Sequence, residues 1–268
     1  MFSYEGKRVL VVGGATGMGG AAAQKAKAGG AHVTVLDVAK VEFPVDAFIQ
    51  IDLRDKASVE GVINQLSGPF DAVFSCAGVA DGTRGIVLIN FISQRRLLEG
   101  LVAKGALTRG SAVGMISSTA GNGWKTNLAQ VQEFLAIPDW DGQAAWIEAH
   151  KSENYMENAD GYRFSKEAMC GYVAQCATEL LKKGIRINAI LPGPTDTPLA
   201  RANANIWLAY ATDYRNAVGV KHLQPEEMAD PLLYLCSPMA SGITGENIIV
   251  DHGYTSSQIT GSFGGPAR

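Results

Sequence analysis

The feature that most constrains the fold of this chain is a buried strand that runs directly into a glycine-rich turn and then into a helix. Residues 9–19 read VLVVGGATGMG and lead into the Ala-rich segment AAAQKAKAG. In a dinucleotide site, Gly13 would permit the tight turn, Gly17 the approach of a pyrophosphate, and Gly19 close helix packing. The N–H groups that open the helix would then bind phosphate. An ordinary tight turn also needs glycine, so the motif alone leaves both interpretations open.

Strand-like and helix-like segments alternate along the rest of the chain. Short apolar runs rich in β-branched residues, such as VTVL, AVF, AVGMI and IRINAIL, are typical of strands buried on both faces. Their alternation with helical segments indicates a parallel sheet covered by helices on both sides. The expected strands include 8–13, His32–Asp37, 72–75 and 186–191, and the expected helices include Gly17–Ala28 and 56–66. We therefore expect an α/β, doubly wound, Rossmann-like sheet in a single domain, 1–268.

Two long segments interrupt this alternation. The first, at about 119–161, is expected to be a helical insertion with helices near Leu128–Ala136 and 143–150. The second, at about 198–224, is expected to form a substrate loop, because such long connections in a compact domain are usually lids or extra helices. We expect the Gly/Ser-rich tail, 254–268, to be partly disordered or to lie across a neighbouring subunit.

Composition excludes several classes of protein. The 268 residues, 47% of them hydrophobic, suffice for one large core, and a net charge of −3 does not favour nucleic acid or an anionic membrane as partner. No apolar run of about 18 residues or signal-peptide pattern appears, so a soluble, cytoplasmic protein is expected. The four cysteines form no CxxC pattern and no dense disulfide framework, so we expect reduced thiols and no metal site.

Asp37 ends the second expected strand, about 20 residues after the glycine turn. A carboxylate in this position binds both hydroxyls of an adenosine ribose and repels a 2′-phosphate. No arginine closely follows Gly13 or Asp37, although Lys40 is near. The sequence therefore predicts NAD(H) rather than NADP(H) as the cofactor.

Tyr162 and Lys166 lie four residues apart on an expected helix that begins near Tyr162. Side chains at this spacing share one face of a helix. A free tyrosine titrates near 10, and a nearby cation favours its phenolate, so the pair suits proton transfer near neutral pH. The spacing also arises by chance, and the pair would then be a packed aromatic ring beside a solvated charge.

The spacing of Gly13, Gly17 and Gly19 resembles that of the short-chain dehydrogenase/reductase family. Further motifs follow in the order typical of that family, and they cover residues 9 to about 253. They are Asp52 and Leu53, then Cys76, Ala77 and Gly78, then Asn90, Ser118, Tyr162 with Lys166, and Pro192 and Gly193 with Thr195 and Thr197. The resemblance implies a Rossmann-like fold, a nicotinamide cofactor and oxidation of alcohols or reduction of ketones.

The resemblance also implies which residues hold the cofactor. Asp52 and Leu53 would contact adenine, and Ala77 and Gly78 would line the ribose, while Cys76 stands where the family usually has asparagine. Pro192 and Gly193 would pack against the nicotinamide, and the two threonines would bond its carboxamide or the phosphates. The full predicted set is Gly13, Thr16, Gly17, Met18, Gly19, Asp37, Asp52, Leu53, Cys76, Ala77, Gly78, Tyr162, Lys166, Pro192, Gly193, Thr195 and Thr197.

Four residues are predicted to be catalytic. Tyr162 would be the general acid and base, supported by Lys166. Ser118 follows the expected strand AVGMI and would hold the substrate oxygen; Ser117 is the competing assignment, and the family pattern favours the second serine. Asn90 resembles the asparagine that positions a water beside the lysine in a proton relay, although it would equally serve by satisfying helix backbone.

The substrate is expected to be a bulky hydrophobic alcohol or ketone. All four tryptophans lie in the two irregular segments, together with Phe134, Leu199, Tyr210 and Tyr214. These side chains would line the pocket mouth, or instead fill the core of the insertion or an oligomer interface. The long connection from Ser118 to Tyr162 resembles bacterial 3α-hydroxysteroid dehydrogenases, coniferyl-alcohol dehydrogenases and monomeric carbonyl reductases, so a 3α-hydroxysteroid is one candidate.

Other functions and the assembly state were weighed against the same residues. A sugar-nucleotide epimerase would need a larger segment after Asp251, and a serine hydrolase would need a GxSxG motif around Ser118. A dinucleotide-binding sensor without turnover remains the alternative from another class. Relatives form dimers or tetramers, often through the helix of the Tyr–Lys pair, so we expect a homo-oligomer, although the insertion could obstruct that interface and leave a monomer.

Overall fold

The computed structural model describes residues 3–152 and 158–264, and within these residues seven strands form one parallel sheet. The strands are β1 (Arg8–Val12), β2 (His32–Asp37), β3 (Ala47–Gln50), β4 (Phe70–Ser75), β5 (Leu107–Ile116), β6 (Arg186–Pro192) and β7 (Asn247–Val250). Their order across the sheet is β3-β2-β1-β4-β5-β6-β7, so the winding direction reverses between β1 and β4. The doubly wound, Rossmann-like fold predicted from the alternating pattern is confirmed.

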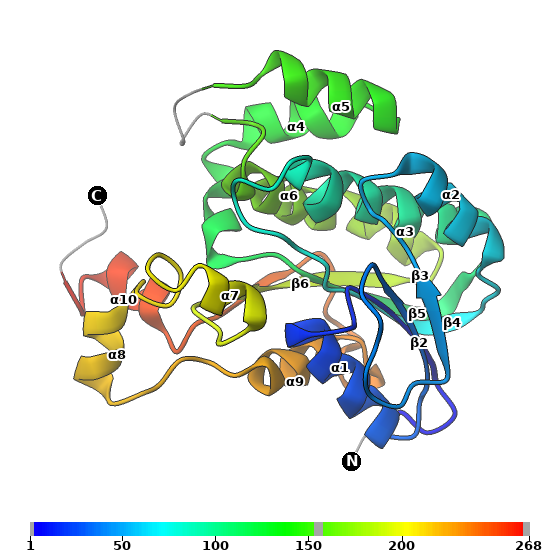
Figure 1. Ribbon diagram of the computed structural model, residues 1–268, viewed down its shortest axis with the longest axis horizontal. Helices are drawn as coiled ribbons and strands as arrows, with labels where there is room; N and C mark the ends of the chain where they lie inside the picture. Colours follow the sequence, from blue (N-terminus) through cyan, green and yellow to red (C-terminus); the bar gives the residue numbers. More distant parts are fainter. Residues whose placement is uncertain (1–2, 153–157, 265–268) are drawn as a thin grey trace.

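Helices cover both faces of the sheet (Figure 1). One face carries α1 (Gly17–Ala28) and α9 (Pro225–Leu235), and the other carries α2 (Lys56–Gln65), α3 (Ser93–Ala103) and α6 (Tyr162–Lys182). Neighbouring strand residues point to opposite faces, so Val11 packs in the core beneath α1 and α9, whereas Leu10 and Val12 pack in the core beneath the other three. The strands β1, β4 and β6 are thereby buried on both sides over most of their length, which explains their largely apolar sequences, whereas the edge strands β3 and β7 are partly exposed.

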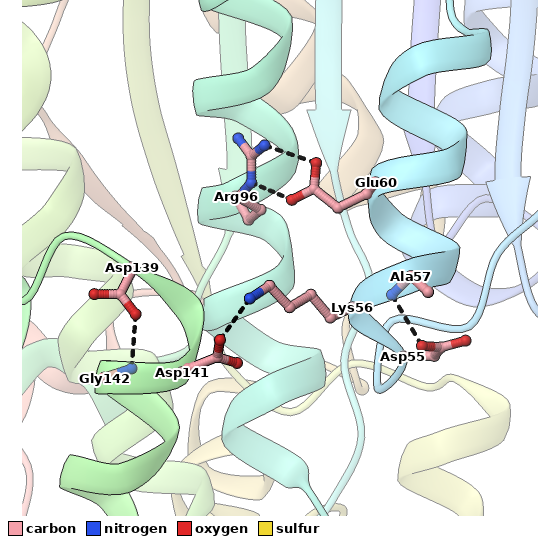
Figure 2. Close-up of polar contacts among 8 residues, drawn as sticks. All are labelled: Asp55, Lys56, Ala57, Glu60, Arg96, Asp139, Asp141 and Gly142. Atoms are coloured by element: carbon pink, nitrogen blue, oxygen red, sulfur yellow. Dashed lines mark hydrogen bonds and ion pairs between the residues drawn. The ribbon is translucent and has the colours of Figure 1, made fainter.

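The insertion adds a further layer outside α6 (Figure 1). It begins with a 3-10 segment, Thr119–Lys125, and continues as α4 (Leu128–Ala136) and α5 (Trp140–Ala149). The first predicted helix is confirmed at its predicted bounds, while α5 begins earlier than the predicted 143–150. The reason is a cap: the Asp139 carboxylate accepts the N–H of Gly142 at 2.9 Å (Figure 2). Residues 153–157 of the insertion lie outside the described residues.

The segment after β6 and the tail contain three short helices. They are α7 (Pro198–Ala202), α8 (Thr212–Val218) and α10 (Tyr254–Thr260). Residues 254–260 of the tail form α10, and Tyr254 packs with ring centroids 5.3 Å from both Tyr210 and Tyr214. Residues 265–268 of the tail lie outside the described residues.

Among the helices of the described chain, none is long and apolar enough to cross a membrane. No group of three or more His, Cys, Asp or Glu side chains is placed to hold a metal ion in the part of the chain that the structure describes. The four cysteines are free thiols, as predicted, and Cys170 and Cys236 are buried.

Candidate active site

Most of the predicted cofactor residues gather around one cavity at the carboxyl edge of the sheet. All the strands are parallel, so the loops that follow them meet at the same edge, and the cavity lies where the strand order reverses. Its volume is about 380 Å³. Of the predicted residues, it is lined by Gly13, Thr16, Gly17, Met18, Gly19, Asp37, Asp52, Leu53, Cys76, Ala77, Gly78 and Thr197. Pro192, Gly193, Thr195, Tyr162 and Lys166 do not line it.

The glycine turn fits closely between β1 and β4. Gly13 has φ +74°, a conformation that favours glycine, and a Cβ there would lie 2.5 Å from Ala77 Cα. Both the backbone conformation and the lack of space therefore exclude a side chain. A Cβ on Gly19 would lie 2.0 Å from the Gly13 carbonyl oxygen. The turn leads directly into α1. The cap residue of α1, Thr16, makes no side-chain hydrogen bond to the helix, and the first turn of α1 contains no acidic residue. The positive end of α1 therefore borders the cavity without a neutralising carboxylate of its own helix.

Two aspartates stand at the far end of the cavity. Asp37 ends β2, where one carboxylate oxygen accepts the N–H of Ala15 at 2.9 Å and the other that of Ala39 at 3.0 Å. Asp52 follows β3 and binds Arg54 with both oxygens, at 3.1 and 2.8 Å, which holds the pKa of Asp52 below its usual value. Arg54 also lines the cavity and was missed by sequence reasoning, although it stands two residues after Asp52.

Cys76 occupies the position at which the family usually has asparagine. Its N–H donates to the Val12 carbonyl at 2.8 Å, which continues the pairing of β1 with β4 beyond the last residue of the strand. Burial raises the pKa of its thiol, so the side chain is neutral at physiological pH. A Cβ on Gly19 would lie 2.9 Å from the Cys76 Cβ, so this side chain packs directly against the start of α1.

Tyr162 and Lys166 come together at the start of α6. Lys166 Nζ lies 5.4 Å from the centre of the Tyr162 ring and donates to the Ile116 carbonyl at 3.0 Å. The lysine is 3% exposed, and burial lowers its pKa to about 8. A Cβ on Gly78 would lie 3.5 Å from Nζ, so the ammonium stands beside the cavity that Gly78 lines. The helical spacing thus brings the predicted pair to the edge of the predicted pocket.

The two serines after β5 differ in their surroundings. Ser117 is buried, and its hydroxyl donates to the Lys166 carbonyl at 2.9 Å while accepting from the Cys170 thiol at 3.3 Å. Ser118 is half-buried, and its oxygen accepts the N–H of Ala120 at 3.2 Å. Ser117 therefore ties β5 to α6, whereas the Ser118 hydroxyl keeps its own proton to donate.

Asn90 lies in a π-helical turn, Leu88–Ile92, that precedes α3. Its side chain accepts the N–H of Val79 at 2.8 Å and donates to the Val79 carbonyl at 3.1 Å and to the Ser165 hydroxyl at 3.2 Å. It is fully buried, and π-helical turns occur frequently at functional sites. The amide thus holds the loop after β4 against α6 and does not satisfy the backbone of its own helix.

The loop after β6 brings one of its two threonines to the cavity. Thr197 caps α7, accepting the N–H of Ala200 at 3.1 Å, and lies across from the glycine turn. A Cβ on Gly17 would lie 3.7 Å from its side chain. Thr195 is buried and donates to the Gly193 carbonyl at 2.9 Å, so its hydroxyl is engaged within the loop.

The aromatic side chains of the irregular segments form two groups. Trp146 is 8% exposed and packs on Phe134 and Phe164, with ring centroids 5.1 and 5.4 Å away, so it belongs to the core between the insertion and α6. Trp207 lies in the loop after β6, and its ring centroid is 5.0 Å from that of Tyr162. Trp146 therefore lies in a core, which is one of the alternatives predicted from sequence, whereas Trp207 lies against Tyr162 and does not line the cavity.

Two family models match the chain. One, described as Enoyl-(Acyl carrier protein) reductase, matches residues 108–255, and the other, described as NAD dependent epimerase/dehydratase family, matches residues 9–133. The first covers more than half of the chain. The protein belongs to the short-chain dehydrogenase/reductase family, as the order of its motifs predicted.

Individual relatives are similar over nearly their whole length. The chain is 26% identical to coniferyl-alcohol dehydrogenase of Pseudomonas sp. (strain HR199 / DSM 7063) over 258 residues, 94% of this chain and 98% of the relative. It is 28% identical to 3-alpha-hydroxysteroid dehydrogenase/carbonyl reductase of Comamonas testosteroni over 255 residues, 91% and 95% of the two chains. The crystal structure of the 3-alpha-hydroxysteroid dehydrogenase from Pseudomonas sp. B-0831 complexed with NADH has a TM-score of 0.75 at 25% identity, covering 96% and 100% of the chains.

Proposed function

We propose that this protein is an NAD(H)-dependent oxidoreductase that interconverts a secondary alcohol and a ketone, or an alcohol and an aldehyde, on a bulky hydrophobic substrate. The observation that carries the proposal is the Lys166 ammonium 5.4 Å from the Tyr162 ring centre, beside the cavity formed by the glycine turn and the strand ends. When bound there, the nicotinamide cofactor would supply or accept the hydride. The chain itself would bind and orient the substrate and the cofactor, and it would transfer the proton.

The cavity residues fit a dinucleotide. Side chains are excluded at Gly13 and Gly19, and the uncapped start of α1 offers N–H groups to phosphate. Asp37 would bind the adenosine ribose, since its carboxylate is held on the cavity wall by the N–H of Ala15. Thr197 would reach the phosphates from the opposite side.

The proton chemistry would be carried by Tyr162. Its phenol would donate a proton to the carbonyl oxygen during reduction and take one from the alcohol during oxidation. The Lys166 ammonium favours the phenolate, and with a pKa of about 8 it is mostly charged at neutral pH. The Ser118 hydroxyl would hold the substrate oxygen, and Asn90 would position a water in a relay to Lys166.

Replacement of the phenol tests this mechanism. Tyr162→Phe removes the exchangeable proton and keeps the ring, so turnover should fall by about 10³-fold or more while NADH binding stays near normal. The measurement is NADH absorbance in steady state, combined with NADH fluorescence titration of the same variant. Retention of most of the activity would contradict the mechanism, and cofactor binding without turnover of any alcohol or ketone by the wild type would favour the sensor alternative.

The cofactor preference is proposed from Asp37. A carboxylate fixed at the ribose end repels a 2′-phosphate, so NADH should be preferred to NADPH by about 10-fold or more in kcat/KM. Asp37→Ser should narrow this ratio, because it removes the charge and keeps a ribose-bonding hydroxyl. A higher kcat/KM with NADPH in the wild type would contradict the proposal.

The substrate class is proposed from Trp207 and from the relatives. The indole beside Tyr162 offers an apolar wall to a ring system, which suits a 3α-hydroxysteroid; carbonyl reductase or aromatic-alcohol dehydrogenase activity is the alternative. A screen with NAD⁺ against steroid, aromatic and terpenoid alcohols ranks these candidates by kcat/KM.

We also propose a homo-oligomeric, cytoplasmic protein. In this chain α4 packs on the middle of α6, where a Cβ on Gly171 would lie 2.4 Å from the Val131 side chain. An interface through that part of α6 would be obstructed, so we expect a dimer or tetramer that uses another surface. Sedimentation or light scattering measures the assembly state.

A further inference from the structure

The helix that carries Tyr162 and Lys166 begins without a cap of its own. Its cap residue is Gly161, which has no side chain, and its first turn contains no acidic residue. The first N–H groups of any helix lack intrahelical partners, and a side-chain oxygen usually satisfies one of them. Here the oxygen comes from the loop after β4, where the Asp81 carboxylate accepts the N–H of Tyr162 at 2.7 Å.

The carbonyl of Tyr162 is held as well. It accepts the hydroxyl of Ser165 at 2.6 Å, and that hydroxyl accepts the side-chain N–H of Asn90 at 3.2 Å. Asn90 in turn holds both main-chain groups of Val79, two residues before Asp81. These bonds close a ring that runs from the strand-end loop through the π-helical turn to the first turn of α6.

We propose that Asp81 is a positioning residue for the tyrosine, an inference that rests on the proposed function. The ends of helices fray, and the side chain of Tyr162 starts from the first residue of α6. A charged acceptor makes a stronger bond than a neutral one and interacts favourably with the positive end of a helix. The carboxylate therefore keeps the phenol in register with Lys166, one turn further along. Misplacement of a reacting group by about 1 Å costs up to about 100-fold in rate.

Asp139 offers a matched control, because it caps α5 with the same chemical group (Figure 2). Asp139→Ala removes the cap of a different helix, α5, whereas Asp81→Ala removes the one at Tyr162. We expect Asp81→Ala to lower kcat by about 10-fold at unchanged KM for the cofactor. Asp81→Asn keeps an acceptor oxygen and should recover kcat to within about 3-fold of wild type. Asp139→Ala should have wild-type kcat.

Three results would each overturn the assignment. They are wild-type kcat in Asp81→Ala, an equal loss of kcat in Asp139→Ala, and no recovery in Asp81→Asn. Circular dichroism and NADH fluorescence establish that each variant is folded and binds cofactor. If Asp81→Ala does not fold, Asp81→Leu takes its place: it also lacks an acceptor oxygen, and wild-type kcat in that variant would equally overturn the inference.

Tyr162→Phe separates this inference from the proposed function. If Tyr162→Phe abolishes turnover and Asp81→Ala changes nothing, only the role of Asp81 is wrong. If Tyr162→Phe keeps its activity, the proposed function itself fails.

Discussion

The insertion, 119–161, and the loop after β6, 198–224, each place a tryptophan at the start of the same helix, α6, but against different residues. Both are rich in aromatic residues, and both interrupt the strand–helix alternation. The insertion packs Trp146 against Phe134 and Phe164, whereas the loop places Trp207 against the first residue of α6. Aromatic content therefore does not locate a pocket. What differs is the residue that each ring meets at the start of α6, which is Phe164 for Trp146 and Tyr162 for Trp207.

The two segments are also held in place by different interactions. The insertion is held by buried aromatic rings and by surface ion pairs such as Lys56 to Asp141 at 2.6 Å (Figure 2). The loop is held by the buried guanidinium of Arg215, which donates to the Leu208 carbonyl at 2.6 Å, next to Trp207. Burial lowers the pKa of Arg215, but a guanidinium remains charged at any physiological pH. We infer that the insertion contributes stability and the loop contributes activity. Variants of Trp146 and Trp207 test this contrast, and a variant of Lys166 tests the helix that both segments contact.

The largest expected effect is on stability. Trp146→Ala should lower the free energy of unfolding by about 3–5 kcal/mol, because it leaves a cavity among packed rings. At temperatures where the variant is folded, its kcat/KM should stay near the wild-type value. Urea unfolding and steady-state kinetics provide the two measurements. A 10-fold loss of kcat/KM in a folded variant would contradict the inference that the insertion contributes stability and not activity.

The second prediction is a substitution that raises the free energy of unfolding instead of lowering it. Lys166→Met should abolish activity and stabilise the fold by up to about 3 kcal/mol at pH 7, because a lysine whose pKa falls from 10.5 to about 8 resists burial as a cation. Between pH 8 and 10.5 the unfolded wild type binds more protons than the folded one at this residue, so its stability should rise relative to the variant across that window. Urea unfolding at pH 7 and pH 10 measures the difference. If the variant were less stable than wild type at pH 7, burial of the Lys166 cation would not be a cost to the stability of the fold.

The smallest expected effect is on specificity. Trp207→Ala should lower kcat/KM by about 10-fold for a multi-ring alcohol and by less for a small one, with unfolding free energy unchanged within about 0.5 kcal/mol. Trp207→Phe, which keeps an aromatic wall, should retain most of the activity. Kinetics on one large and one small substrate measure the contrast. An equal loss of kcat/KM for both substrates would show that Trp207 does not determine substrate specificity.

Most of the residues that the sequence predicts for the cofactor line one cavity. Gly13, Asp37 and Gly78 each follow a short apolar run, and parallel strands bring the loops after such runs to one edge. The substrate side was less readable. The sequence did not distinguish the four tryptophans from one another. The structure shows that Trp146 packs on Phe134 and that Trp207 packs on Tyr162.

By itself the sequence determined the doubly wound sheet, the glycine turn and the Tyr162–Lys166 pair, because each depends on a short-range period or on a residue type that a turn requires. Only the tertiary structure decided which serine faces α6, which tryptophan reaches the tyrosine, and that Asp81 caps the helix of that tyrosine. These outcomes depend on contacts between segments far apart in the chain. Asp81 and Tyr162 are 81 residues apart, and no local period or spacing encodes their meeting.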